Sequence, residues 1–156
     1  MRGGPVYYPP VSMPAVIEVH RPPFTISTDP TRVDLVAMTD LLRRTYWAGN
    51  MTTDILARAI AGSICFGVYE DETQVGIARV ITDHVTHAYL SDVCIAESHR
   101  GRGLALWLMD VILAHPSLQN LRRVDLITRD AQTLYARFGF EPIAHPDRHM
   151  ERVPRA

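Results

Sequence analysis

The sequence has no lysine: all sixteen basic side chains among its 156 residues are arginine. This absence excludes enzymes that form a Schiff base through a lysine amine, including those that use pyridoxal phosphate. It also excludes P-loop nucleotide-binding proteins, whose Gly-Lys-Ser/Thr motif contacts the phosphates through lysine. Side-chain cations that bind a phosphorylated ligand must therefore be arginines.

Cysteine is also scarce, and long apolar runs are missing. The two cysteines, Cys65 and Cys94, lie in apolar segments without a Cys-x-x-Cys motif, so we expect buried thiols in a reducing compartment. No apolar run approaches the roughly 18 residues of a membrane span. Four prolines interrupt the first 14 residues, unlike the apolar stretch of an export signal. We therefore expect a cytoplasmic protein without a membrane partner.

Neither sign of charge is in large excess. The net charge is −1 at pH 7 and the isoelectric point is about 6.6. Because such a chain has no basic field that attracts DNA or RNA, we expect no nucleic acid partner. The seven histidines form no set with metal-ligand spacing, so we expect no metal. After these exclusions, we expect the ligand to be a small molecule.

Proline is concentrated at the N-terminus. Six of the eleven prolines fall within residues 1–23, where each one fixes φ and removes a backbone N–H group. We predict an extended arm over residues 1–23 that docks on the domain or on the second subunit of a homodimer. At roughly 150 residues per domain, residues 24–156 form a single domain.

The hydrophobic pattern after residue 23 alternates between strand and helix periods. Thr52 or Thr53 caps a helix whose Ile55, Leu56 and Ile60 face inward, and Asp130 caps the last helix. The predicted elements are a strand over 24–27, helices over 31–44 and 53–61, strands over 64–70, 74–82 and 86–96, a helix over 103–115, a strand over 123–128, a helix over 131–138 and strands over 140–143 and 149–153. This order predicts an α/β fold with a mixed, mostly antiparallel sheet flanked by helices.

The segment over residues 92–105 leads from an apolar strand through a loop of glycine and arginine into an apolar helix. The first turn of a helix has unpaired N–H groups and a positive dipole end, which together bind anions. Gly101 and Gly103 allow unusual φ values, while Arg100 and Arg102 supply bidentate donors for phosphate oxygens. The alternative is a plain polar turn before a helix.

This segment resembles the acyl-CoA loop of the GNAT superfamily of N-acetyltransferases, whose pattern is Arg/Gln-x-x-Gly-x-Gly/Ala. Arg100, Gly103 and Ala105 fit that pattern. Residues 131–140 (AQTLYARFGF) resemble the family's Ala-x-x-Leu-Tyr-x-x-x-Gly-Phe helix, although Thr128 stands where the family often has asparagine. Leu106 excludes the dinucleotide motif Gly-x-Gly-x-x-Gly, which requires glycine there.

The resemblance implies acetyl-CoA as co-substrate, bound in a cleft between two central parallel strands. It implies that residues 93–95 splay from the neighbouring strand, pair their backbone with the pantetheine arm and polarise the thioester through an amide N–H. The implied cofactor-binding residues are Val93, Cys94, Ile95, Arg100, Gly101, Arg102, Gly103, Leu104 and Ala105.

The resemblance also suggests catalytic and acceptor residues, each with a structural alternative. Tyr135 resembles the family's general acid, or packs as an apolar helix residue. Asp92, a charge inside an apolar run, is a candidate general base if burial raises its pKa, or it forms an ion pair with an arginine. Tyr46 and Trp47 grip the acceptor or fill the core. We expect Cys94 to be buried rather than a nucleophile.

The resemblance implies direct transfer of an acetyl group from acetyl-CoA to a primary amine, in a ternary complex without a covalent intermediate. The expected acceptor is a small-molecule amine or a peptide. The alternative function is a catalytically silent module that binds acetyl-CoA as a sensor.

Overall fold

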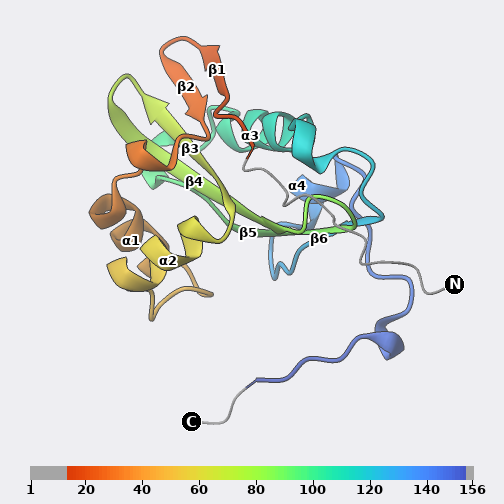
Figure 1. Ribbon diagram of the computed structural model, residues 1–156. Coiled ribbons are helices and arrows are strands. Elements are labelled where there is room, and N and C mark those ends of the chain that lie inside the picture. The colour runs from red at the N-terminus through yellow and green to blue at the C-terminus, as the bar shows by residue number, and fades with distance from the viewer. Residues whose placement is uncertain (1–13, 154–156) are drawn as a thin grey trace, which may run out of the picture. The chain divides into compact units, whose positions relative to one another are not determined.

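The computed structural model describes residues 14–153, so Pro5, Pro9 and Pro10 of the predicted arm lie outside the described residues. The chain divides into two compact units, Met1–Leu126 and Ile127–Ala156. The first unit contains a six-stranded sheet whose strands follow one another in chain order from β1 to β6 (Figure 1). All neighbours are antiparallel except β5 and β6, which are parallel. The predicted mixed, mostly antiparallel sheet is confirmed.

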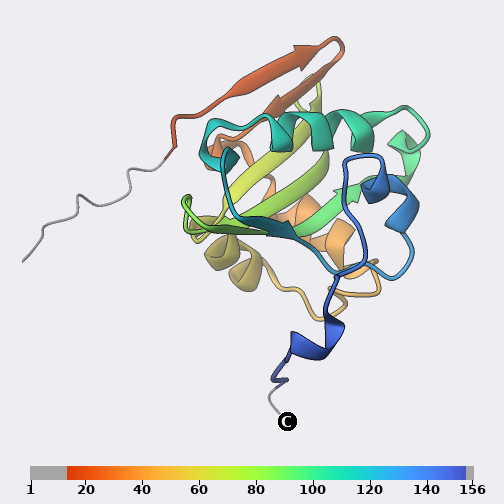
Figure 2. The same ribbon diagram turned by 90° about the vertical axis from the view of Figure 1, so that its right-hand side faces the viewer.

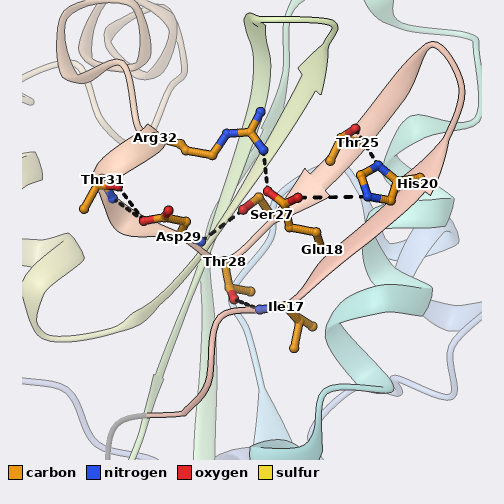
Figure 3. Close-up of polar contacts among 9 residues, drawn as sticks. All are labelled: Ile17, Glu18, His20, Thr25, Ser27, Thr28, Asp29, Thr31 and Arg32. Atoms are coloured by element: carbon orange, nitrogen blue, oxygen red, sulfur yellow. Dashed lines mark hydrogen bonds and ion pairs between the residues drawn. The ribbon is translucent and has the colours of Figure 1, made fainter.

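A hairpin of β1 (Glu18–Arg21) and β2 (Phe24–Ser27) forms one end of the sheet. Side chains hold it in place: Glu18 pairs with Arg32, and Ile17 exchanges hydrogen bonds with Thr28 at 2.9 and 3.0 Å (Figure 3). Residues 18–21, which the sequence analysis assigns to the arm, therefore form the edge strand of the sheet.

The central strands are β3 (Ile64–Glu70), β4 (Thr73–Thr82) and β5 (His87–Ile95), close to the predicted ranges. Most of β3 and β4 is buried because helices cover both faces of the sheet. Helices α1 and α2 lie on one face and α3 crosses the other (Figures 1 and 2).

Helices α1 (Leu35–Arg43) and α2 (Thr53–Ala61) begin at side-chain caps. The Asp34 carboxylate accepts a hydrogen bond from the Ala37 amide at 2.9 Å, and the Thr52 hydroxyl accepts one from the Ile55 amide at 3.2 Å, as predicted for the second helix. The prediction that Ile55 faces inward is wrong, because its side chain is 40% exposed. The buried core beneath the two helices comprises Met38, Leu42, Ala48, Leu56, Ile60, Cys65, Ile77 and Cys94.

Helix α3 (Leu104–Leu113) leads into a short strand, β6 (Arg123–Asp125). Half of the α3 side chains are buried, in agreement with its nearly continuous apolar sequence. None of the helices within residues 14–153 combines the length and hydropathy that crossing a bilayer requires.

The second unit contains α4 (Gln132–Ala136), which is shorter than predicted. Asp130 does not cap it; instead the Thr128 hydroxyl accepts a hydrogen bond from the Ala131 amide at 3.1 Å. Gly139 ends the segment with φ of +80°. The predicted strands over 140–143 and 149–153 are wrong: the described residues 141–153 contain only a short 3-10 helix (Pro146–Arg148) and are exposed, so their apolar side chains have no face to bury.

Candidate functional site

The loop between β5 and α3 has the conformation that its glycines allow. Gly101 and Gly103 have φ values of +73° and +76°, and Gly103 is the N-cap of α3. Neither glycine has an atom within 4 Å of an added Cβ, so backbone conformation rather than space requires glycine at both positions. The first amides of α3 consequently follow a turn in which Gly101 and Gly103 carry no side chain, at the positive end of the helix dipole.

A pocket lies at this turn. Six of its residues are among those predicted to bind the cofactor, while His99 and Leu106 were not predicted. The lining residues are Ile95, His99, Arg100, Gly101, Gly103, Leu104, Ala105 and Leu106. We call this set the loop pocket; it brings the end of β5 and the first turn of α3 together.

The two arginines of the loop are held by different partners. Arg100 donates from Nε to the Ile95 carbonyl at 3.2 Å, which ties the loop back to β5. Arg102 donates to the Glu70 carboxylate at 3.2 Å, and its guanidinium carbon lies 4.8 Å from the centre of the Phe24 ring. Both arginines therefore stand beside the turn of Gly101 and Gly103, with Arg102 already paired to an acid.

Glu70 joins the loop to the end of β3. One of its oxygens lies 2.9 Å from His99 Nε2 and the other accepts from Arg102. The hydrogen bond with His99 and the charge of Arg102 hold the pKa of the Glu70 carboxyl below its usual value. The carboxylate therefore stays charged and braces the loop from outside the pocket.

Next to the loop pocket, one edge of β5 has no strand partner among the described residues. Its parallel pairing with β6 covers only His87, Ala88 and Tyr89. Within residues 14–153, no pairing with β6 continues to Val93, Cys94 and Ile95. On the opposite side, Cys94 and Ile95 pair with β4. Among the strands of the sheet, residues 94 and 95 therefore have a partner on the β4 edge only.

The sheet is irregular at Asp92. The register of β5 against β4 shifts between Ile77 and Arg79, and Asp92 has a left-handed φ of +55°. Its buried carboxylate accepts a hydrogen bond from Arg79 Nε at 2.6 Å. Of the two interpretations of Asp92, the structure shows the ion pair.

The remaining predicted residues lie in different environments. Tyr46 and Trp47 follow α1, are each 46% exposed and form an edge-to-face pair with centroids 4.9 Å apart, so the core-filling alternative is wrong. Tyr135 belongs to α4 in the second unit, where its buried ring packs 5.8 Å from that of Phe140. Burial raises the pKa of the Cys94 thiol, so this residue is a poor nucleophile, as expected.

Three residues near the site were missed from the sequence: Glu70, Arg79 and His99. Arg79 is the single charge between Val75 and Ile81, the same signal that identified Asp92. His99 directly precedes Arg100 in the recognised motif. Glu70 ends an apolar strand, and only the folded sheet brings it to the loop.

The comparisons with known proteins agree with this geometry. Residues 61–142 match the acetyltransferase (GNAT) domain family. A Gibberella zeae protein described as an acetyltransferase is 34% identical over 137 residues, covering 73% of this chain and 76% of its own.

Solved structures share the fold. A protein from Xanthomonas campestris pv. campestris, described as an acetyltransferase of the GNAT family, superposes with a TM-score of 0.80 at 44% identity, covering 92% of this chain and 96% of its own. A Clostridium acetobutylicum protein described as an acetyltransferase with acetyl-CoA has a TM-score of 0.61 at 14% identity, covering 83% and 94%; this likeness shows the fold alone.

Proposed function

Because the chain belongs to the GNAT superfamily of acetyltransferases, we propose that it transfers an acetyl group from acetyl-CoA to a primary amine by direct attack in a ternary complex. The observation that carries this proposal is the loop pocket, where two left-handed glycines precede α3 beside the open edge of β5. The glycine turn suits the anionic diphosphate of an acyl-CoA, and the edge of β5 suits its extended pantetheine arm.

The residues of the loop pocket fit the diphosphate of CoA. Gly101 and Gly103 have no side chain that would cover the backbone amides of this turn. A phosphate can therefore approach the amides at Gly101, Gly103 and Leu104. Arg100 and Arg102 add positive charge at the rim of the same turn. Acetyl-CoA, when bound, supplies the activated acetyl group as a thioester.

The open edge of β5 is our candidate for binding the pantetheine arm and the thioester carbonyl. The backbone of Val93, Cys94 and Ile95 pairs with an extended ligand in the manner of an added strand. An amide N–H in this stretch stabilises the negative charge that develops on the carbonyl oxygen. The extra residue in β5 at Asp92 breaks the regular β4 ladder just before these amides.

Tyr135 is our candidate for the general acid that protonates the departing thiolate. A phenol keeps its proton at neutral pH, since its unperturbed pKa is about 10. We do not assign the general base to Asp92, because Arg79 binds its carboxylate inside the protein. The proton of the acceptor ammonium leaves through another group or through water.

Tyr46 and Trp47 are our candidates for the acceptor site. Their exposed rings form a surface that binds an amine by cation–π contact or a peptide by stacking. We propose that the acceptor is a small-molecule amine or a peptide. The free, buried Cys65 and Cys94 support a cytoplasmic location for the reaction.

The test is an assay of CoA thiol release from acetyl-CoA with a panel of amines: a polyamine, an amino acid, an aminoglycoside and a peptide with a free N-terminus. We expect steady release with at least one of them, above the rate without amine. Acetyl-CoA binding measured by calorimetry, together with no release for any amine, would support the sensor alternative. Absence of binding would contradict both functions.

A further inference from the structure

We propose that Arg79 is a positioning residue for acetyl transfer: through its ion pair with Asp92, it holds the bulge that sets the direction of the β5 backbone at Val93. This inference rests on the proposed function and adds to it a residue that lies away from the loop pocket. Four observations support it: the register of the sheet, the side to which Asp92 points, the other contacts of Arg79 and the burial of the pair.

The register shows an extra residue in β5. Ile77 pairs with Cys94, whereas Arg79 pairs with Ser91, so Asp92 and Val93 together oppose the single residue Ala78. This is a β-bulge, which bends a strand and re-aims its backbone. The left-handed φ of +55° at Asp92 is uncommon for a residue with a Cβ and costs conformational energy. The surrounding structure must supply contacts that offset this cost.

The bulge and the ion pair depend on each other. Successive side chains of a regular strand point to opposite faces of the sheet, so Ser91 and Asp92 would not share a partner. Here Arg79 donates from Nε to the Asp92 carboxylate at 2.6 Å and from Nη2 to the Ser91 hydroxyl at 3.5 Å. Only the bulge brings both side chains to the Arg79 face. Removing the ion pair removes the contact that holds Asp92 there.

The same guanidinium connects the bulge to α2. Arg79 Nη1 donates to the Ala59 carbonyl and to the Ser63 hydroxyl, both at 3.2 Å. The Ala59 carbonyl lies in the last turn of α2, where the negative end of the helix dipole favours a cation. A single planar side chain therefore fixes the position of Asp92 against a helix end.

Burial of the pair points to a role in positioning. The side chains of Arg79 and Asp92 are 9% and 4% exposed. A buried ion pair is seldom more stabilising than well-packed apolar residues of similar volume, because both charges lose their hydration. What this pair does supply is a fixed direction for Asp92, and hence for the Val93 amide that follows it.

The test compares Arg79→Met, Arg79→Lys and the apolar pair Arg79→Met/Asp92→Leu with the wild-type enzyme. We expect kcat for acetyl transfer to fall by about 10- to 100-fold in Arg79→Met, since small misplacements of reacting groups cost that much. Arg79→Lys should recover part of the loss. The dissociation constant of acetyl-CoA should rise by a smaller factor than kcat falls, because the loop pocket stays intact while the backbone of residues 93–95 is displaced. Arg58→Met removes an exposed pair with Asp54 from α2 and should leave kcat unchanged.

Two further readouts separate positioning from stability and from base catalysis. The apolar pair should restore the melting temperature but not kcat, whereas recovery of kcat along with stability would overturn the proposal. Asp92→Asn should keep the ascending limb of the pH–rate profile; loss of that limb would identify Asp92 as the base and would also overturn the proposal.

Amide NMR makes the test independent of turnover. We expect the backbone resonances of Val93 and Cys94 to shift, and their hydrogen exchange to accelerate, in Arg79→Met but not in Arg58→Met. Unchanged resonances would contradict the role of Arg79 even if acetyl transfer occurs. If the wild-type chain releases no CoA with any amine, the proposed function fails, whereas the resonances still decide whether Arg79 holds the bulge.

Discussion

Arginine has two distinct uses in this lysine-free chain. Arg79 is buried and donates hydrogen bonds to four acceptors. The N–H groups of a planar guanidinium point toward all four, whereas the ammonium of a lysine could not donate in all of these directions. Arg102 is 44% exposed and lies over the Phe24 ring while it pairs with Glu70. In our proposals, the first holds the bulge of β5 and the second places charge beside the diphosphate of CoA.

Removal of the Tyr135 hydroxyl tests the proposed general-acid catalysis directly. In Tyr135→Phe the ring that packs against Phe140 is kept and the proton donor is lost. We expect kcat to fall by about 100-fold or more, the usual contribution of a general acid, with an unchanged dissociation constant for acetyl-CoA. Steady-state kinetics and calorimetry measure the two quantities.

Tyr69→Phe is the matched control for that variant. Tyr69 is buried, and its hydroxyl has no hydrogen-bond partner within residues 14–153. Removing this hydroxyl should leave kcat unchanged and should not lower stability. A wild-type kcat in Tyr135→Phe would remove Tyr135 from the mechanism.

Among the elements, α3 and its preceding loop depend on two glycines. Alanine at Gly103 must adopt φ of +76°, which costs roughly 1–2 kcal/mol for a residue with a Cβ. The free loop of this variant relieves the strain by leaving the left-handed turn, and acetyl-CoA must restore the turn on binding. Since about 1.4 kcal/mol corresponds to a tenfold change in affinity, we expect Gly103→Ala to weaken acetyl-CoA binding by about tenfold. Calorimetric titration with acetyl-CoA measures this change.

Gly49→Ala provides the comparison for Gly103→Ala. Gly49 also has no atom within 4 Å of an added Cβ, and its φ lies outside the left-handed region. Alanine there should leave acetyl-CoA affinity unchanged. Equal effects of the two substitutions would show that the left-handed turn is not what binds the cofactor.

Elements with strong local signals were predicted well from the sequence. The Thr52 cap and the apolar pattern defined α2, and the strand period defined β3 and β4. The final strands were predicted wrongly because alternating apolar residues indicate a strand only if one face is buried. Strand β1 was missed because prolines flank it, while its pairing with β2 depends on tertiary contacts such as that between Glu18 and Arg32.

For the molecule as a whole, the site was partly predictable because its motif is continuous in the chain. The loop residues from Arg100 to Ala105 are neighbours in the chain, so the glycine turn before α3 was visible in sequence. Glu70 contacts the loop and Arg79 contacts the bulge only because the sheet brings distant strands together, and no local sequence pattern predicts such contacts. Asp92 is an intermediate case. The sequence indicated either a general base or an ion pair with an arginine, and the folded structure identifies Arg79 as that arginine.

Burial of both cysteines leads to a prediction for the intact fold. Burial raises the pKa of Cys65 to about 12, and it also raises the pKa of Cys94. Since the thiolate is the reactive form, neither side chain should react with a thiol reagent in the native protein, and two equivalents should react after unfolding. A colorimetric thiol titration tests this expectation. Rapid reaction of the native protein would contradict the buried positions of both residues.

The exposed ring of Trp47 also has a spectroscopic consequence. The chain has two tryptophans: Trp47 stands beside Tyr46 in the candidate acceptor surface, and Trp107 lies in α3 just after the loop pocket. Each proposed half of the site therefore carries its own natural fluorophore. With Trp107 replaced by phenylalanine, emission from Trp47 reports acceptor binding without any added label, so unknown acceptors can be screened before a reaction is found.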